Sequence, residues 1–548
     1  MKRPHSLAVG ALLGAISSFP MMALLYLGSQ LWGMPFVPFD RFDWLARVLP
    51  GDIITAGIDT IVLLVDRLNL GATDAASKLI EQLLALLLTI LIGILFGVVT
   101  GWATTKTETG YGWSVGLIVG LLFFGLMATL ELSNQLSGAT MALLWLALIY
   151  GTWGTLLGYW LGDATPAVAT DATGHVVRPQ PDRRKALVQI AGGSLAIALA
   201  GWGIGRYGGT DRRGTAGAGQ PLANMPTATP TGSAAVIPDV PAATPTLTMR
   251  ERIAAAPGTR REITANEDFY RIDINTRPPV IERASWQLEV AGLFDQTEPL
   301  TLDDLMAMPA VTQPITISCI SNRIGGDLIS ASEWTGVRLR DLLAKVGLQA
   351  EAQELAIQAT DGFYESVSMQ DMMDPRTLLV YGMNGETLPV EHGFPLRIYI
   401  PNRYGMKQPK WITQIEATSE KGSGYWVDRN WSAEARPRII SIIDAVATDQ
   451  PTADGAVPIG GIAWAGDRGV QQVEIQVDDG AWNEAILRTP PLGPLIWVQW
   501  RYDWASTGSG QHTFRVRAVD GTGTLQIGEA SGVRPDGATG YHEVSVTL

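Results

Sequence analysis

The chain has 548 residues, a formal net charge of −13 and a single cysteine. This length suggests roughly three to five domains, and the acidic balance argues against nucleic acid as a partner, because phosphate binding needs basic patches. One cysteine excludes an intrachain disulfide, a thiolate-rich zinc site and an iron–sulfur cluster. The CxxCH motif of a c-type haem is also absent.

Long uncharged stretches predict about five transmembrane helices, because each is close to the ~20 residues that cross a hydrocarbon core of roughly 30 Å. A buried core helix is the alternative for any one of them. Alternating the spans places the basic residues Lys2, Arg3, Lys106 and 183–185 on one side of the membrane. By the positive-inside rule this predicts a multi-pass protein of the cytoplasmic membrane, with everything after residue 206 extracytoplasmic. The uncharged stretches are 6–34, 82–105, 112–130, 135–162 and 186–205.

Residues 51–67, GDIITAGIDTIVLLVDR, differ from the spans. The aspartates at 52, 59 and 66 are seven residues apart, which places them along one side of a helix. This pattern predicts an amphipathic helix on the membrane surface, with a short re-entrant helix as the alternative. Residues 1–162 are therefore expected to form four spans and this interfacial helix.

Residues 163–206 are expected to form a cytoplasmic loop followed by the fifth span. The sequence DRRKALV at 182–188 resembles a twin-arginine export signal; ordinary positive-inside charge is the alternative. Ala198–Ala200 resembles a small-residue cleavage site, and we expect the span to be retained. Residues 207–262 are rich in Gly, Thr, Ala and Pro and predict a flexible linker.

Residues 263–435 predict a mixed α+β domain. WQLEVAG at 286–292 alternates as a half-buried strand does. Thr301 is a typical N-cap for a short helix ending at Met306, and Gly347 is a typical end for a helix over 338–346.

Residues 436–548 predict an all-β domain. Apolar residues alternate with polar ones at 473–477 and 514–518, and Asp-Gly turns separate the strands. Short strands at regular spacing are typical of an immunoglobulin-like sandwich.

The cysteine lies in ITISCISNRIGGDL, residues 315–328. A lone cysteine is more often a small buried hydrophobe than a ligand. Its context, however, resembles the sulfite oxidase family of molybdenum enzymes, in which a molybdopterin domain precedes an immunoglobulin-like dimerisation domain. The resemblance covers 266–548 and is carried by the blocks FYRID (269–273), CISNR (319–323), SEWTGVRLRDLL (332–343), YGMNGETLPVEHGFPLRIYIP (381–401), YGMKQPKWITQIE (404–416), GYW (424–426) and GIAWAGDRGVQQVEIQVDDGAW (461–482).

The resemblance implies a molybdenum–molybdopterin cofactor whose metal is bound by Cys319, and thiolate suits a soft, sulfur-rich coordination sphere. Tyr381, Arg271 and Arg323 would assist catalysis beside the metal. A buried aromatic is the alternative for Tyr381, and a satisfied core histidine is the alternative for His392. The implied cofactor-binding residues are Phe269, Tyr270, Arg271, Asp273, Cys319, Asp361, His392, Arg397, Gly405, Lys407 and Lys410.

Two departures from the family pattern concern the substrate pocket. Ile324 stands where family sulfite oxidases carry a second arginine, and a glycine replaces a tryptophan before the 332–343 block. Losing a fixed cation from an anion site removes about 1.5–3 kcal/mol of charged hydrogen bonding. Sulfite is therefore one candidate substrate among several.

We expect an oxidoreductase that transfers an oxygen atom to or from a small molecule, possesses no nucleic-acid partner, and forms a homodimer through 436–548. Its electron partner is external, either a protein or a quinone reached through the bilayer. A reductase of sulfoxide-like substrates and a catalytically inactive cofactor-binding scaffold are the alternatives. A transporter is disfavoured, because substrate paths usually keep charged residues at mid-span.

Overall fold

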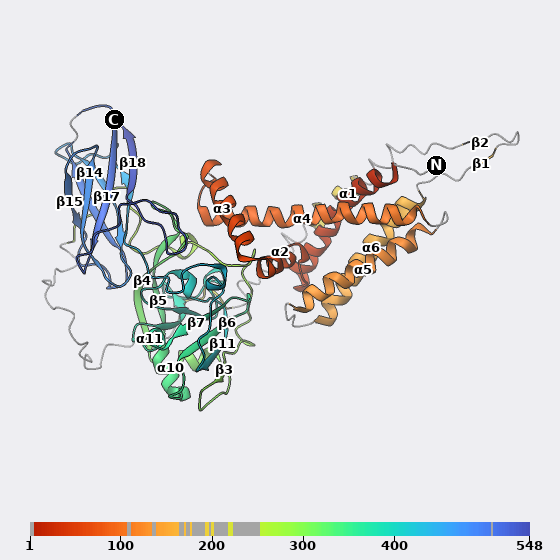
Figure 1. The fold of residues 1–548 in the computed structure, drawn as a ribbon, viewed down its shortest axis with the longest axis horizontal. Coiled ribbons are helices and arrows are strands. Elements are labelled where there is room, and N and C mark those ends of the chain that lie inside the picture. Colours follow the sequence, from red (N-terminus) through yellow and green to blue (C-terminus); the bar gives the residue numbers. More distant parts are fainter. Residues whose placement is uncertain are drawn as a thin grey trace. The chain divides into compact units, whose positions relative to one another are not determined.

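The computed structural model describes residues 5–68, 70–106, 111–133, 139–163, 169–170, 176–177, 192–196, 199–201, 217–222, 252–505 and 508–548 (Figure 1). They form two compact units. The first consists of residues 1–49, 77–211 and 275–277, and the second of 50–76, 212–274 and 278–548.

The first unit is helical. Four of its helices are long and apolar enough to cross a membrane, which agrees with the first four predicted spans. The fifth predicted span and the DRRKALV segment fall mainly outside the described residues. The helices are α1 (His5–Trp32), α2 (Val37–Val48), α4 (Thr73–Thr104), α5 (Gly112–Ser133) and α6 (Ala139–Asp163), and two-residue strands β1 (Ala169–Thr170) and β2 (Val176–Val177) form a short antiparallel pair.

Glycine spaced four residues apart allows close approach of neighbouring helices in this unit. A Cβ on Gly116 of α5 would lie 2.0 Å from the carbonyl oxygen of Gly154 on α6, and one on Gly158 would lie 2.2 Å from that of Gly112. Small residues at membrane-helix interfaces permit this backbone contact. The same arrangement joins α1 to α4 through Gly10, Gly14, Gly93 and Gly97.

Replacing Gly116 with alanine is expected to destabilise the helical unit by about 1–3 kcal/mol, the usual range for overpacking. The reason is that the backbone of α6 leaves no space for the added methyl group. Gly125 on the same helix is a matched control, because nothing lies within 4 Å of the point where its added methyl group would stand. Thermal unfolding in detergent would measure both, and equal midpoints for the two variants would contradict the packing argument.

Helix α2 is absent from the sequence-based prediction, although its boundary signals are present. A proline lies in the first turn, Asp40 is also there, and Arg47 occupies the last turn. Such residues favour the two ends of a helix. The helix is too short and too charged to have been found by a search for apolar runs. It buries the charged residues Arg41 and Asp43 as well as apolar ones.

Helix α3 (Gly51–Leu68) belongs to the second unit. Its acidic side contacts that unit: Asp52 accepts a hydrogen bond from Asn430 at 3.4 Å, and Asp59 pairs with Arg534 at 3.1 Å. Ile53 and Leu63 are exposed. A helix therefore forms over the predicted residues, and two of its aspartates have partners in the second unit. Its location on a membrane surface stays a prediction.

Two sheets form the central part of the second unit. The first has the order β10-β8-β5-β4, is antiparallel throughout, and carries β9 on β8; the second has the order β3-β11-β6-β7, with β3 and β11 parallel. One apolar core contains Val337, Leu379, Leu355 and Ile415 from both sheets. The strands are β3 (Glu289–Gly292), β4 (Ala310–Ser318), β5 (Ile329–Arg338), β6 (Glu354–Ala359), β7 (Tyr364–Ser368), β8 (Leu378–Met383), β9 (Glu386–Thr387), β10 (Arg397–Tyr399) and β11 (Ile412–Thr418).

The short helices of this part bear out the predicted end signals. Thr301 caps α9 (Leu302–Met306) in a reciprocal capping box with Asp304, and Gly347 ends α10 (Leu339–Val346) at φ 74°. The remaining helical turns are α11 (Met369–Met372), η2 (Asn266–Asp268), η3 (Val390–His392), η4 (Gly405–Lys407) and η5 (Val427–Arg429).

The C-terminal strands form one antiparallel sheet of seven strands in the order β12-β13-β16-β15-β14-β17-β18. Val473, Ile475, Phe514 and Val516 are fully buried, as their alternation predicts. The immunoglobulin-like assignment itself stays a prediction. The strands are β12 (Ile440–Val446), β13 (Val457–Trp464), β14 (Val470–Val477), β15 (Trp482–Leu487), β16 (Val498–Trp504), β17 (Gln511–Asp520) and β18 (His542–Thr547).

The end of the predicted linker differs from the expectation, because residues 252–262 pack on the C-terminal strands. Arg260 pairs with Asp444 at 2.7 Å, and its carbonyl accepts a hydrogen bond from Gln499 at 2.6 Å. Arg252 also pairs with Glu262. Residues 217–222, also inside the predicted linker, bond to the β9 hairpin, where the Gln220 N–H donates to the Thr387 hydroxyl at 2.9 Å. Both segments are therefore packed where the composition predicted a flexible linker.

Candidate active site

Cys319 begins a loop that follows the edge strand β4. Its backbone N–H donates to the carbonyl of Leu328 at 3.0 Å, and the side-chain oxygen of Asn322 accepts from the Leu328 N–H, also at 3.0 Å. Gly326 lies so close to Asn322 that a Cβ there would be 2.5 Å from its Oδ1. The Asn and Gly positions of the CISNRIGG motif therefore close this loop and hold the cysteine in one place.

The thiol of Cys319 is buried, with 8% of the residue exposed. Its sulfur is 3.0 Å from the hydroxyl of Ser321. Burial raises the pKa of the thiol, against the opposing effect of hydrogen bonds from Ser321 and Ile320. The protein alone thus favours the neutral thiol, and a bound metal cation would supply the positive charge that a thiolate needs.

Phe269 and Tyr270 connect the cysteine loop to the interior. The Phe269 ring packs edge-on against Trp334 and His392, at centroid distances of 5.4 and 5.2 Å. The Tyr270 hydroxyl interacts electrostatically with Cys319, and burial raises its pKa well above the ordinary value. A Cβ on Gly405 would lie 3.1 Å from this hydroxyl.

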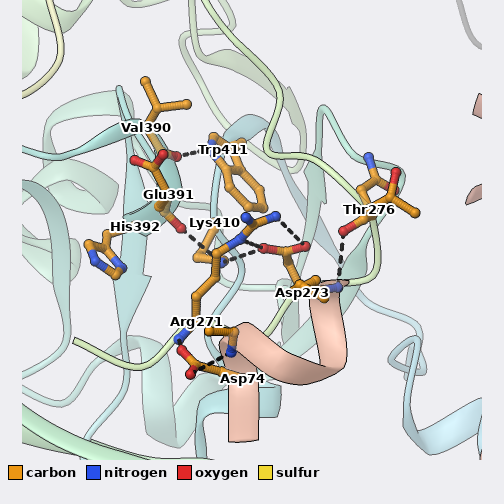
Figure 2. A network of polar contacts seen from close by, with 12 residues as sticks. Asp74, Arg271, Asp273, Thr276, Val390, Glu391, His392, Lys410 and Trp411 are labelled. Atoms are coloured by element: carbon orange, nitrogen blue, oxygen red, sulfur yellow. Dashed lines mark hydrogen bonds and ion pairs between the residues drawn. The ribbon is translucent and has the colours of Figure 1, made fainter. Parts of the chain in front are cut away.

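Arg271, Asp273 and Lys410 form a polar network (Figure 2). The Arg271 guanidinium donates to the carboxylate of Asp273 at 2.6 Å, and Lys410 lies 3.5 Å from the same carboxylate. The backbone N–H of Arg271 donates to Asp74 at 2.7 Å. Lys410 also donates to the Glu391 carbonyl at 3.1 Å. The first turn of α4, the loop that holds 271–273, the η3 turn and the residue two positions before β11 therefore meet at this network.

Arg397 and His392 lie side by side deeper in the protein. The guanidinium of Arg397 donates to the His392 carbonyl at 3.2 Å and lies 4.7 Å from the centre of the Trp334 ring. His392 Nε2 is 2.9 Å from the carbonyl oxygen of Asn266, so this nitrogen carries the proton. Arg397 Nε is buried and has no hydrogen-bond partner among the residues that the structure describes.

The site is electropositive. Burial lowers the pKa of Arg397 to about 10 and that of Lys410 to about 8. Burial also lowers the pKa of His392 to about 3, and the charges of Lys410, Arg397 and Arg271 add to this effect. Buried cations with a remaining donor atom fit an anionic ligand such as a phosphate monoester, which accepts several charged hydrogen bonds. The residues present therefore fit the phosphate of a pterin cofactor.

The His392 pKa gives a pH dependence of stability with a defined sign. The ring is neutral in the folded protein down to about pH 3, whereas the unfolded chain takes up a proton near 6.5. Its contribution is therefore fully present above pH 6.5 and is lost as the pH falls toward 3. We expect the thermal midpoint of cofactor-free protein to fall less between pH 7.5 and 5.0 in His392→Gln than in wild type. Asp361 has a raised pKa and acts in the opposite sense, but it is present in both proteins; an equal fall in both would contradict the assignment.

Of three further predicted site residues, only Asp361 joins the polar network of Arg271, Asp273 and Lys410. Asp361 is buried and interacts electrostatically with Asp273 and Lys410, so it belongs to the network. Lys407 forms a close ion pair with the buried carboxylate of Glu365, which already neutralises its charge. Arg323 lies in the cysteine loop with an exposed side chain.

Tyr381 is placed in a different packing group. Its ring belongs to the apolar core of both sheets with Leu379, whereas Phe269 and Val380 belong to the cluster on the other face of β8. Burial raises the pKa of Tyr381 to about 12. Tyr270, which was predicted only to contact the cofactor, interacts electrostatically with the Cys319 thiol.

Several residues of the site were missed in the sequence. Asp74 is 197 positions from Arg271 and lies in a segment predicted as membrane protein. Tyr404 interacts electrostatically with Cys319, and burial raises its pKa to about 12. Glu365 lies in no motif. Tyr404 is the first residue of the YGMKQPK block, so that block could have identified it as a site residue. No sequence motif marks Asp74 or Glu365.

Comparison with known proteins places these residues in a family. The oxidoreductase molybdopterin-binding domain family matches residues 275–426. The oxidoreductase YuiH of Bacillus subtilis is 34% identical over 149 residues, covering 27% of this chain and 73% of that protein. The mitochondrial sulfite oxidase of Rattus norvegicus is 29% identical over 287 residues, 44% of this chain and 52% of the relative.

A third relative is the YedZ1 subunit of Azospira oryzae, whose name assigns it to protein-methionine-sulfoxide reduction. It is 34% identical over 153 residues, covering 28% of this chain and 56% of that protein. The chain thus spans little more than half of the YedZ1 and sulfite oxidase sequences. The N-terminal apolar helices fit a membrane region. The chain belongs to the sulfite oxidase family of molybdopterin oxidoreductases, and molybdopterin is its cofactor.

Proposed function

We propose that this protein transfers an oxygen atom to or from a small sulfur-centred substrate, at a head anchored to the cytoplasmic membrane and facing away from the cytoplasm. The observation that carries the proposal is the joint burial of the Cys319 thiol and the Arg397 guanidinium, both of which interact electrostatically with Tyr270. A scaffold without catalysis would not need a thiol held in this loop. The bound molybdenum centre supplies the two-electron oxygen-atom chemistry.

The chain's own residues would hold and orient that centre. Cys319 would bind the metal as a thiolate, and Arg397 and Lys410 would bind the pterin phosphate. His392 is neutral and presents no charge of its own to the cofactor. Asp273 fixes the Arg271 side chain at 2.6 Å, so that Arg271 contributes positive charge at the edge of the network.

Proton transfer near the thiol would fall to Tyr270 or Tyr381. Both phenols have raised pKa values because of burial, so each keeps its proton at neutral pH and can donate a hydrogen bond. Of these two, Tyr270 is the one with an electrostatic interaction with Cys319. Comparing Tyr270→Phe with Tyr381→Phe in turnover would assign the role.

The substrate pocket supports a weakly charged substrate. Ile324 removes a cation that family sulfite oxidases carry, and the Arg323 side chain is exposed. A reductase of sulfoxide-like substrates is the second candidate, and its support is the relative from Azospira oryzae. A neutral sulfoxide needs no fixed pair of cations, unlike sulfite.

Anchoring is supported by the four apolar helices. The extracytoplasmic location rests on the basic residues of the loops, and a homodimer through the C-terminal domain rests on the family resemblance. The electron partner is external, a protein or a quinone.

The decisive experiment measures molybdenum and pterin in the purified wild-type protein and screens sulfite, thiosulfate, dimethyl sulfoxide and methionine sulfoxide with artificial electron carriers. We expect about one molybdenum per chain and turnover with at least one sulfur compound. Stoichiometric cofactor without turnover of any of these compounds would support the scaffold alternative instead. If protein purified from a strain that assembles the cofactor contains no molybdenum, the proposal is rejected.

A further inference from the structure

The first unit contains charged side chains buried among its helices. Arg41 of α2 and Glu131 of α5 are only 6% and 1% exposed, and Tyr150 of α6 is 1% exposed. Arg41 donates to the hydroxyl of Thr89, in the middle of α4, at 2.6 Å. Tyr150 interacts electrostatically with Arg41, Glu131 and Asp40. We call Asp40, Arg41, Glu131 and Tyr150 the membrane polar cluster.

Three polar atoms of the membrane polar cluster lack a hydrogen-bond partner among the described residues. Arg41 Nε, Asp40 Oδ2 and Glu131 Oε1 are buried and have no hydrogen-bond partner in the described part of the chain. Thr89 has no proton left for the two carboxylate oxygens, because its hydroxyl donates to the Ala85 carbonyl at 2.9 Å. Unsatisfied buried groups are costly, and ionisable residues within membrane segments commonly mark a functional site. A cluster that contains both an unsatisfied donor and unsatisfied acceptors indicates a ligand that can both accept and donate hydrogen bonds.

Aromatic rings adjoin the cluster. Tyr150 contacts the Phe123 ring edge-on at 5.4 Å and the Trp153 ring at 6.2 Å. Trp153 in turn stacks on Phe96 at 4.3 Å. These rings lie on helices suited to cross a membrane. A ligand here would be flat, apolar and lipid-soluble, with oxygen atoms able to accept and donate hydrogen bonds.

We propose that the membrane polar cluster binds the headgroup of a lipid quinone. Arg41 and Tyr150 donate hydrogen bonds to a quinone oxygen, and Glu131 and Asp40 exchange its protons. This inference rests on the proposed function, because a two-electron oxidoreductase needs a carrier. Among the described residues no cluster of His, Cys, Asp and Glu could hold a second metal centre.

The overall electron balance is complete. In the oxidase direction, addition of a water oxygen to the substrate releases two electrons and two protons, and a quinone takes up two electrons and two protons to become a quinol. In the reductase direction the quinol gives up the same electrons and protons, and the substrate oxygen leaves as water.

Quinone binding is tested on the full-length holoprotein in lipid nanodiscs, by quenching of tryptophan fluorescence with decylubiquinone and with menadione. We expect Arg41→Gln and Glu131→Gln each to weaken binding at least tenfold. The ratio of quinone-coupled to ferricyanide- or viologen-coupled turnover should fall by a similar factor. Lys106→Gln is the control, because Lys106 lies two residues beyond the C-terminal end of α4, over the Trp102 ring at 3.6 Å and 17 positions from Thr89.

Wild-type affinity in both cluster variants would overturn the inference, as would wild-type protein that turns over with soluble carriers but binds neither quinone. Loss of turnover with every carrier would overturn the proposed function instead, since quinone binding is measured independently. If the variants do not accumulate, photo-crosslinking of an azido-quinone to wild-type protein decides. Labelling within 37–48, 123–131 or 145–153 supports the site, and labelling elsewhere refutes it.

Discussion

Replacing Cys319 with serine is expected to reduce turnover by more than about 100-fold. Loss of an outer-shell partner of a metal ligand typically costs 10–100-fold, and loss of the ligand itself should cost more. Serine keeps the size and the closed loop, because the loop is held by backbone bonds to Leu328 and by Asn322 rather than by the sulfur. The fold and the pterin site should therefore survive while the metal environment changes.

Molybdenum content, pterin content and turnover rate would be measured on the same preparation. The absorption bands of metal-bound sulfur would be recorded as well. Ser321→Ala is the matched control, since it removes the hydroxyl 3.0 Å from the sulfur and leaves the thiol in place. We expect its turnover to stay within about tenfold of wild type. A Cys319→Ser protein with wild-type turnover would remove Cys319 from the metal site.

Local signals in the sequence predict many elements of this fold. Thr301 and Gly347 mark helix ends because capping depends on a few adjacent residues. The alternation at Val473 and Ile475 predicts a strand because one face is buried. The apolar stretches predict α1, α4, α5 and α6 because their length and composition suffice.

The parts that escaped prediction depend on contacts between distant segments. Asp74 meets Arg271 across 197 positions, and Lys407 meets Glu365 across 42. Neither pairing has a periodicity or a spacing that a single sequence reveals. The glycines of α5 and α6 did have a signal, a four-residue spacing that begins at Gly112 and at Gly154, but only the packed helices show which partner each glycine faces.

The candidate site follows the same division. Motif blocks place Cys319, Arg397 and Lys410 together because the family resemblance brings distant blocks into one site. The resemblance cannot show whether a cationic side chain is available to the cofactor or is already paired with a carboxylate. Lys407 is already paired, with Glu365. The resemblance also cannot decide which face of β8 a side chain occupies, and this is what separates Tyr381 from the cluster of Phe269.

Replacing Arg397 with methionine is expected to move cofactor content and apoprotein stability in opposite directions. Burial lowers the pKa of Arg397 to about 10, which means that the empty protein disfavours its charge. Methionine fills a similar volume against the Trp334 ring, where the guanidinium lies 4.7 Å from the ring centre. The thermal midpoint of cofactor-free protein should therefore stay level or rise.

Cofactor affinity should fall in the same variant, because a charged hydrogen bond to an anion contributes about 1.5–3 kcal/mol, which is roughly 10- to 150-fold in affinity. Pterin content after purification measures this loss, and differential scanning fluorimetry of apoprotein measures the midpoint. Arg340→Met on the exposed side of α10 is the control and should change neither. If Arg397→Met lowers the midpoint and pterin content together, Arg397 supports the fold rather than binding the cofactor, and the phosphate would have to be held by Lys410 and Arg271.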